Sequence, residues 1–210
     1  MPFFLVGLSG PSCSGKSSAA DIFHDNGLGL RIRLDGFYRG DEKAYRNESG
    51  DLDWEDIRSF DADGAARALR NLQDGNATPI PTYEREFHRV TGMEDVDPAL
   101  GLWKFIVADS IFCLDDPLFP LFDFVVHMHI DEDLLVHRRR ERQKKNQQGE
   151  WNYSDRYHES CMRPSLARLA SLAETRQKED KAKLEIVDVS TLSVVAAIVK
   201  VYDRIVESKR

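Results

Sequence analysis

Short apolar runs alternate with longer polar and apolar mixtures along most of the chain. The apolar runs cover residues 3–8, 30–34, 105–108, 124–130 and 184–189. Runs of this length, bounded by glycine or polar residues, are typical of strands that are buried on both faces of a parallel sheet. The pattern therefore predicts five core strands.

The segments between these runs repeat apolar residues at helical spacing. They predict helices over residues 16–26, 63–73, 131–145, 155–173 and 192–207. Gly27 and Gly75 follow the first two as C-terminal stop signals. We interpret the stripe in the last helix as core, and its members are Val194, Val195, Ile198, Val201, Tyr202 and Ile205. Strands alternating with helices indicate an α/β fold with helices on both faces of the sheet.

Two stretches interrupt this alternation. Residues 39–57 and 78–99 are too polar and too irregular to be core elements, and "PIPTY" and "GMEDVDP" are turn-forming material. Both follow elements of the sheet layer, so we expect them on one rim of it. At 210 residues the chain is predicted to form a single domain, 1–210.

Composition and charge narrow the function classes. With 29 basic and 36 acidic residues the formal net charge is −7, which argues against binding to nucleic acid or to an anionic membrane surface. One basic cluster, "HRRRERQKK" at 137–145, could still hold a small anion. Cys13, Cys113 and Cys161 show no disulfide or zinc spacing, which favours a reducing cytoplasm. No apolar run approaches 18 residues, so we expect neither a signal peptide nor a membrane span.

The stretch "GPSCSGKSS" follows the first predicted strand directly. Gly10, Gly15, Lys16 and Ser17 match the phosphate-binding pattern GxxxxGK[ST], and the predicted helix begins at the lysine. In this pattern backbone N–H groups and the helix N-terminus surround a polyphosphate, the lysine bridges the outer phosphates and the hydroxyl completes a Mg²⁺ shell. The alternative is a Gly/Ser-rich turn with an exposed lysine. The expected nucleotide-binding residues are Gly10, Ser12, Cys13, Ser14, Gly15, Lys16, Ser17 and Ser18. We interpret Cys13 as a small filler residue rather than a redox switch.

Two carboxylates follow core strands and complete the expected chemistry. Asp109 ends the strand at 105–108, where an acid would orient Mg²⁺ or its water shell; a helix N-cap is the competing interpretation. Asp35, in "RLDGFYR", lies at the same expected sheet edge. It could accept the proton of an attacking hydroxyl or hold the metal, or it could simply begin a turn before Gly36. The chain lacks the guanine-binding NKxD sequence of GTPases and is too short for a large motor.

These residues resemble the uridine kinase-like P-loop kinases, a group that includes phosphoribulokinase, pantothenate kinase and nicotinamide riboside kinase. "LDGFYR" is similar to the family's QDSFYR, which implies that Asp35 is the catalytic base. The resemblance also implies a three-layer P-loop NTPase fold with a five-stranded parallel sheet and a helical lid. It implies ATP and Mg²⁺ as cofactors and a small hydroxyl compound as acceptor, most simply the 5′-hydroxyl of uridine or cytidine.

The resemblance extends to acceptor and lid residues. "DWEDIRSFD" is similar to NWDxPxSFD, which implies that Glu55 binds ribose hydroxyls, with Asp53 as the fallback. "IPTYEREFH" resembles IPxYDFxxH, so Tyr83 and His88 are expected at the base, with Arg85 beside them. The excursions at 39–61 and 78–99 would then bind the acceptor. "HRRRER" resembles the lid motif SRRxxRD, which implies a lid over residues 138–153 with Arg139 and Arg142 clamping phosphate. Their spacing of three on a helix also places them on one face.

Several departures leave the acceptor open. Asp109-Ser110 replaces the family's Glu-Gly, Glu84-Arg85 replaces Asp and an aromatic, and Glu55 is one methylene longer than the family's Asp. An arginine beside the pocket would favour an anionic acceptor. Two alternatives therefore stand beside a uridine/cytidine kinase. One keeps the fold with nicotinamide riboside, pantothenate or a sugar phosphate as acceptor, and the other is a regulatory protein that binds ATP without turnover.

Overall fold

A computed structural model describes residues 2–84, 89–145, 154–192 and 194–208. Its core is a five-stranded, fully parallel sheet of order β2-β5-β1-β6-β7. The strands are β1 (Leu5–Ser9), β2 (Gly29–Arg33), β5 (Phe105–Asp109), β6 (Phe124–His129) and β7 (Leu184–Asp188). The five predicted core strands and the α/β class are thereby confirmed.

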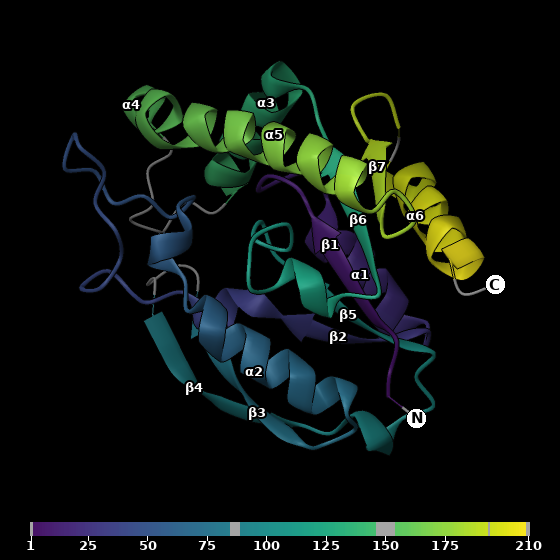
Figure 1. Cartoon of the computed structure of the whole chain (residues 1–210). Coiled ribbons are helices and arrows are strands. Elements are labelled where there is room, and N and C mark those ends of the chain that lie inside the picture. The colour runs from purple at the N-terminus through teal and green to yellow at the C-terminus, as the bar shows by residue number, and fades with distance from the viewer. Residues whose placement is uncertain (1, 85–88, 146–153, 193, 209–210) are drawn as a thin grey trace.

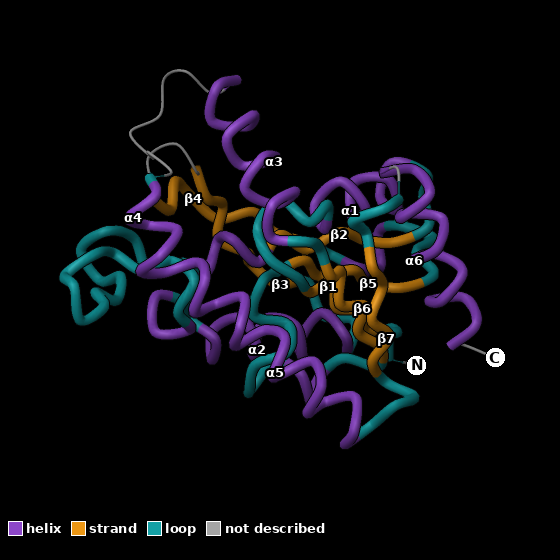
Figure 2. The backbone as a smooth tube through the Cα atoms, turned by 90° about the horizontal axis from the view of Figure 1, so that it is seen from above, coloured by secondary structure: helices purple, strands orange, loops and turns teal. Residues whose placement is uncertain are grey.

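Helices cover both faces of this sheet (Figures 1 and 2). On one side lie α1 (Lys16–Asp25), α3 (Glu132–Lys145) and α6 (Val194–Ser208), and on the other lie α2 (Ala62–Gln73) and α5 (Arg163–Glu179). The rings of Phe23 in α1 and Tyr202 in α6 lie 6.0 Å apart, and Ile205 is fully buried. These two α6 residues confirm part of the predicted apolar stripe; the rest of that stripe lies outside the described side chains.

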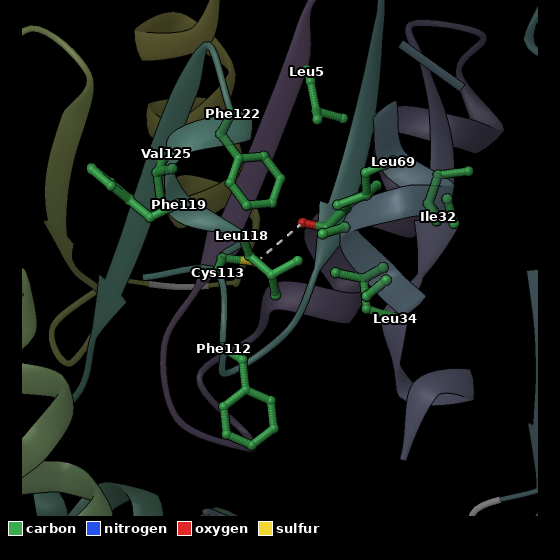
Figure 3. Packing of buried hydrophobic residues seen from close by; sticks show 14 of the residues in the cluster. Leu5, Ile32, Leu34, Leu69, Phe112, Cys113, Leu118, Phe119, Phe122 and Val125 are labelled. Atoms are coloured by element: carbon green, nitrogen blue, oxygen red, sulfur yellow. Dashed lines mark hydrogen bonds between the residues drawn. The ribbon is translucent and has the colours of Figure 1, made fainter. Parts of the chain in front are cut away.

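The apolar core on the α2 side is shown in Figure 3. Leucine, isoleucine and valine side chains from the strands meet α2 and the phenylalanine and leucine side chains of the segment between β5 and β6 in one cluster. Cys113 lies within it, fully buried, and its thiol donates weakly to the carbonyl of Leu8 at 3.5 Å. Burial raises the pKa of this thiol well above its ordinary value. Cys113 is therefore a core residue rather than a reactive one.

The fourth predicted helix differs from the observed one. Residues 155–173 divide into α4 (Asp155–Tyr157), a π-helical turn (His158–Met162) and α5, which continues to Glu179. Pro164 lies in the first turn of α5 and has no N–H to donate. The missing donor interrupts the α-type hydrogen bonding at this junction, which is compatible with the wider π turn before it.

The segment at 78–99 also differs from expectation. It contains an antiparallel hairpin of β3 (Thr78–Glu84) and β4 (Arg89–Val96), followed by a 3₁₀ turn (Pro98–Leu100). Two prolines in β3 and the almost fully exposed β4 conceal this hairpin in the sequence, because neither strand shows the apolar pattern of a core strand. The hairpin lies beside α2 as a separate small sheet (Figure 1).

The stretch at 39–57 is irregular, as predicted. Apart from bends and turns it forms isolated bridges, Arg46 with Leu52 and, at its border, Tyr38 with Phe60, before the 3₁₀ turn Ile57–Ser59. Within the described part of the chain, none of the helices has the length and apolar character needed to cross a membrane.

Candidate active site

The loop between β1 and α1 forms a cradle at the carboxyl edge of the sheet. Gly10 has φ +133° and Gly15, the N-cap of α1, has φ +107°. A Cβ on Gly10 would lie 2.5 Å from the Met128 carbonyl oxygen, so both conformation and space require glycine there. Cys13 takes φ +75°, the one described non-glycine residue with a positive φ. These three positive φ angles bend the loop sharply just before the N-terminus of α1.

The side chains of the cradle are arranged around its interior. The hydroxyl of Ser14 is buried and has no hydrogen-bond partner among the described residues, which suits a loop built to receive an anion. Ser12 and Ser17 are half-buried, while Ser18 lies exposed in the first turn of α1. These positions agree with a phosphate-binding loop, and the buried Ser14 hydroxyl is the observation that best fits phosphate binding.

Lys16 is almost fully buried at the base of this cradle. Its Nζ donates to the Pro11 carbonyl at 2.8 Å. Burial lowers the pKa of Lys16 to about 8, against the opposing effect of the nearby carboxylates of Asp109, Asp35 and Glu55. The structure therefore gathers three predicted site carboxylates around the predicted phosphate-binding lysine.

Ser17 and Asp109 are joined directly. The Ser17 hydroxyl donates to Asp109 Oδ2 at 2.8 Å, and Asp109 is buried at the end of β5. Arg31 of β2 holds the same carboxylate from its other side: its Nε donates to Oδ1 at 3.1 Å and its Nη2 donates to Oδ2 at 3.3 Å. Asp109 is therefore an oriented, paired carboxylate and not a helix cap.

Asp35 lies in the 3₁₀ turn Leu34–Phe37 that continues β2, half-buried at the same sheet edge. The next residue, Gly36, lies against the hairpin: a Cβ there would be 1.9 Å from the Pro81 carbonyl oxygen. The turn that carries Asp35 and the strand that carries Tyr83 are thus in backbone contact. Sequence analysis placed these residues at one rim without finding the contact that joins them.

Glu55 and Arg139 form a buried ion pair. Arg139 Nη2 donates to Glu55 Oε1 at 2.6 Å, and both side chains are less than one tenth exposed. The Asp53 carboxylate accepts the Glu55 backbone N–H at 3.0 Å, and burial raises the pKa of Asp53 to about 6. Arg168 of α5 donates to the Glu55 carbonyl at 3.4 Å. The fallback candidate Asp53 therefore orients the loop that presents Glu55.

Three arginines of α3 contact either the loop after β1 or Glu55. Arg142 Nη2 donates to the Ser12 hydroxyl at 3.2 Å and Arg138 Nη1 donates to the Cys13 carbonyl at 3.4 Å, so both reach the phosphate-binding loop. Arg139 instead reaches Glu55, the residue that the resemblance implies for the acceptor. Of the predicted lid at 138–153, residues 146–153 lie outside the described residues.

Aromatic side chains pack together next to the Asp35 turn. The Tyr38 ring lies 5.8 Å from those of both Tyr83 and Trp54. Trp54 is buried, so it belongs to the packing of the loop. Of the residues expected at the base, Tyr83 is thus placed next to the Asp35 turn, whereas Arg85 and His88 lie outside the described residues.

Ser17 and Asp109 offer hard oxygen atoms side by side, the ligand type that Mg²⁺ prefers. No group of three or more acidic, histidine or cysteine side chains in the described part of the chain could hold a metal ion alone. A Mg²⁺ ion held here would also need phosphate oxygens and water as ligands. The residues present therefore fit a nucleotide-borne cation.

Comparison with curated proteins identifies relatives for this arrangement. The chain is 29% identical over 142 residues to the uridine kinase of Saccharomyces cerevisiae, across 65% of this chain and 28% of that protein. It is 26% identical over 143 residues to the uridine kinase of Limosilactobacillus reuteri (strain DSM 20016), across 66% of this chain and 64% of that one. The matched region thus spans less than two thirds of the length of these relatives. No protein-family model matches the chain.

Solved structures share the fold. A structure named "putative fructose transport system kinase" from Silicibacter sp. TM1040 superposes with a TM-score of 0.56 at 20% identity, covering 88% of this chain and 87% of that chain. One named "Possible Uridine Kinase" from Bacillus stearothermophilus gives 0.51 at 18% identity, covering 70% and 81%. The chain therefore shares the α/β fold of these two structures. Together with the curated relatives, this confirms the resemblance to the uridine kinase-like P-loop kinases.

Sequence analysis missed two arginines of this site. Arg138 lies in the basic cluster, but the lid motif assigned phosphate contacts only to Arg139 and Arg142. Arg31 lies in "LRIRLD", where arginine and apolar residues alternate, so Arg31 and Arg33 share one face of β2. Asp109 belongs to the same face of the sheet as Arg31, and this alternation was the signal that could have joined them.

Proposed function

We propose that the protein is an ATP- and Mg²⁺-dependent kinase that transfers the γ-phosphoryl group to a hydroxyl of a small metabolite. The observation that carries the proposal is the convergence of the glycine cradle, Lys16, the Ser17–Asp109 pair and Asp35 at one carboxyl edge of the sheet. Ligands of doubly wound α/β folds bind at this edge. The curated relatives named uridine kinase support the same reaction class.

In this proposal the P-loop amides and Lys16 bind the phosphates, and Ser17, supported by Asp109, holds the cation. The bound Mg²⁺ would neutralise phosphate charge. Asp35 accepts the proton of the acceptor hydroxyl while that oxygen forms a bond to the γ-phosphorus. The bond from the γ-phosphorus to the β,γ-bridging oxygen breaks, and ADP leaves with the electron pair. Arg142 and Arg138, which touch the loop, are the cations available to the transferring group.

We propose uridine or cytidine as the first acceptor to test, because the resemblance assigns Glu55 to ribose hydroxyls. The Glu55–Arg139 pair offers hydrogen-bond acceptors and donors side by side, which suits a polyhydroxyl compound. Because Glu55 is already ion-paired with Arg139, the second candidate is a different acceptor, such as nicotinamide riboside, pantothenate or a sugar phosphate. A cytoplasmic location remains part of the proposal.

The test is ADP release measured with purified protein across about a dozen acceptors from these classes. Lys16→Ala and Asp35→Asn should each abolish acceptor-dependent ADP release, whereas the matched controls Lys181→Ala and Asp41→Asn, both at exposed positions, should retain it. Near-normal turnover in Asp35→Asn would remove Asp35 from the mechanism. Nucleotide binding without ADP release for any acceptor would favour the regulatory alternative.

A further inference from the structure

Arg31 is a buried cation that none of the expected roles uses. Its side chain is 8% exposed, although β2 is an edge strand of the sheet. A guanidinium group is removed from water at a high cost, which is offset when it forms several charge-assisted hydrogen bonds. Arg31 forms them with two carboxylates, those of Asp109 and Asp21.

The register of the sheet places Arg31 where it can grip Asp109. Arg33 is the residue directly opposite Asp109, and Arg31 is opposite Val107, so Arg31 and Asp109 are diagonal neighbours on one face. That diagonal separation is within reach of a long side chain. The exposed side chain of Arg33 instead lies 3.5 Å from Asp21 and makes no described contact with Asp109.

The contacts leave Asp109 with little freedom. Ser17 and Arg31 Nη2 share Oδ2, and Arg31 Nε takes Oδ1. A carboxylate has about four lone-pair sites, so three donors nearly fill it. Asp109 is then better suited to fix the Ser17 hydroxyl than to bind a cation itself. With its proton given to Asp109, the Ser17 oxygen keeps its lone pairs for the metal.

We propose that Arg31 is a positioning residue for the cation site, acting through Asp109 on Ser17. The inference rests on the proposed function only in that Mg²⁺ arrives with the nucleotide. The proposal also gives a reason why Asp109-Ser110 replaces the family's Glu-Gly. An acidic side chain that is held by an arginine from the neighbouring strand can be shorter than one that must reach the metal unaided.

The experiment measures how much Mg²⁺ tightens nucleotide binding. The probe is the ATP analogue with an imido group at the β,γ bridge. Its binding is titrated calorimetrically with excess Mg²⁺ and again with EDTA. The readout is the dissociation constant in EDTA divided by the dissociation constant in Mg²⁺. Arg31→Met should lower this ratio about tenfold, the order expected when a hydrogen bond to a charged group is lost. Asp109→Asn should lower it similarly, and the double variant should be no worse than Asp109→Asn.

Two controls separate positioning from simple stabilisation. Arg33→Met makes the same substitution on the same strand and also removes a contact to Asp21, but it leaves Asp109 untouched. Asp21→Asn removes the other partner of Arg31. Both should keep the wild-type ratio even if they lower the melting temperature. If Arg31→Met does not fold, Arg31→Lys and Arg31→Gln replace it.

An unchanged or increased ratio in the Arg31 variants, additive effects in the double variant, or a loss reproduced by Asp21→Asn would overturn the assignment. These outcomes differ from failure of the proposed function. A wild-type protein that binds the analogue in a Mg²⁺-dependent way yet phosphorylates none of the acceptors would refute the kinase reaction and leave the Arg31 test valid. A wild-type protein that binds no nucleotide would refute both.

Discussion

The proposed donor side of the site and the proposed acceptor side are built from different kinds of structural element. The phosphate cradle, Lys16, Ser17 and Asp109 lie on the loop after β1, on α1 and on β5, and β1 and β5 are inner strands of the sheet. Glu55, Tyr83 and the Asp35 turn lie on irregular loops, a 3₁₀ turn and the β3–β4 hairpin. In the proposed function, core elements hold the groups that bind phosphate, and peripheral segments hold the groups that bind the acceptor.

The two sides are fastened differently as well. The donor side is fixed by sheet register, since β1 pairs with both β5 and β6. The acceptor loop is fixed by side chains: Arg139 from α3, Arg168 from α5, and Asn47, whose amide donates to the Ser160 carbonyl at 3.3 Å. A change in the acceptor would therefore require changes in a few side chains and no change in the sheet. This difference suggests that substitutions can damage one side and spare the other.

The largest effect should come from Gly10→Ala on the donor side. Residue 10 has φ +133°, a backbone conformation that residues with a side chain rarely adopt. The new Cβ would also lie 2.5 Å from the Met128 carbonyl oxygen, so the cradle must open. Losing preorganised backbone donors should reduce nucleotide-dependent turnover about 10³-fold. The measurement is kcat/KM for ATP together with the dissociation constant for ADP.

Gly27→Ala is the matched control for that change. Gly27 also has a positive φ, +66°, but a Cβ there meets nothing within 4 Å. It should lower stability by about 1 kcal/mol through backbone strain alone and leave ADP affinity unchanged. Equal loss of ADP affinity in both variants would mean that general destabilisation, and not the cradle, explains the effect.

A smaller and more selective effect is expected from Gly36→Ala on the acceptor side. Its Cβ would lie 1.9 Å from the Pro81 carbonyl oxygen, so the hairpin and the Asp35 turn must separate. Displacing a reacting group by about 1 Å can cost about 10²-fold in rate. We expect kcat/KM for the acceptor to fall by that order while the dissociation constant for ADP stays within about twofold of wild type.

Gly92→Ala, in the same hairpin, is the control for Gly36→Ala. A Cβ on Gly92 would lie 3.2 Å from the Thr82 hydroxyl, a contact that a small side-chain shift can relieve. This variant should retain acceptor kinetics. Should Gly36→Ala weaken ADP binding as much as it weakens acceptor use, the two sides would not be separable and the comparison above would be wrong.

The two sides also differ in how much of their structure could be predicted from the sequence. The donor side was predictable because glycine positions, a lysine and strand-end carboxylates are local consequences of wrapping backbone around phosphate. The hairpin was not predictable. Pro79 and Pro81 are unusual within a strand such as β3, and β4 has almost no buried residues, so neither strand shows an apolar pattern. The Glu55–Arg139 and Arg31–Asp109 pairs join residues 84 and 78 positions apart, respectively, and charge pairing at that separation leaves no periodic signal. Motif spacing therefore named Glu55 and Arg139 but not their mutual contact.

The last prediction concerns a proton that joins the two sides at Lys16. Burial lowers the pKa of Lys16 to about 8, whereas carboxylates from both sides, Asp109 from one and Asp35 and Glu55 from the other, oppose that shift. If phosphate binding requires the charged lysine, binding takes up a proton wherever the free protein has lost it. Apparent nucleotide affinity should then fall about twofold between pH 7 and pH 8, as protonation drops from about nine tenths to about one half.

Proton uptake is measured by calorimetric titration of ADP at pH 8 in two buffers of different ionisation enthalpy. The phosphates are fully ionised at this pH, and burial lowers the pKa of His127 to about 4, so neither contributes. About half a proton should be taken up per ADP bound. Asp35→Asn removes one supporting charge, lowers the pKa of Lys16 further and should increase the uptake. A binding enthalpy that is the same in both buffers would contradict this prediction, because it would show that Lys16 stays charged without nucleotide. The pH dependence of the stability of the free protein has the opposite sign to that of the nucleotide affinity. The lysine pKa is 10.5 in the unfolded chain, so above pH 8 the unfolded chain binds more protons than the folded protein. The contribution of Lys16 to the free energy of unfolding therefore increases as the pH rises from 8 toward 10.5.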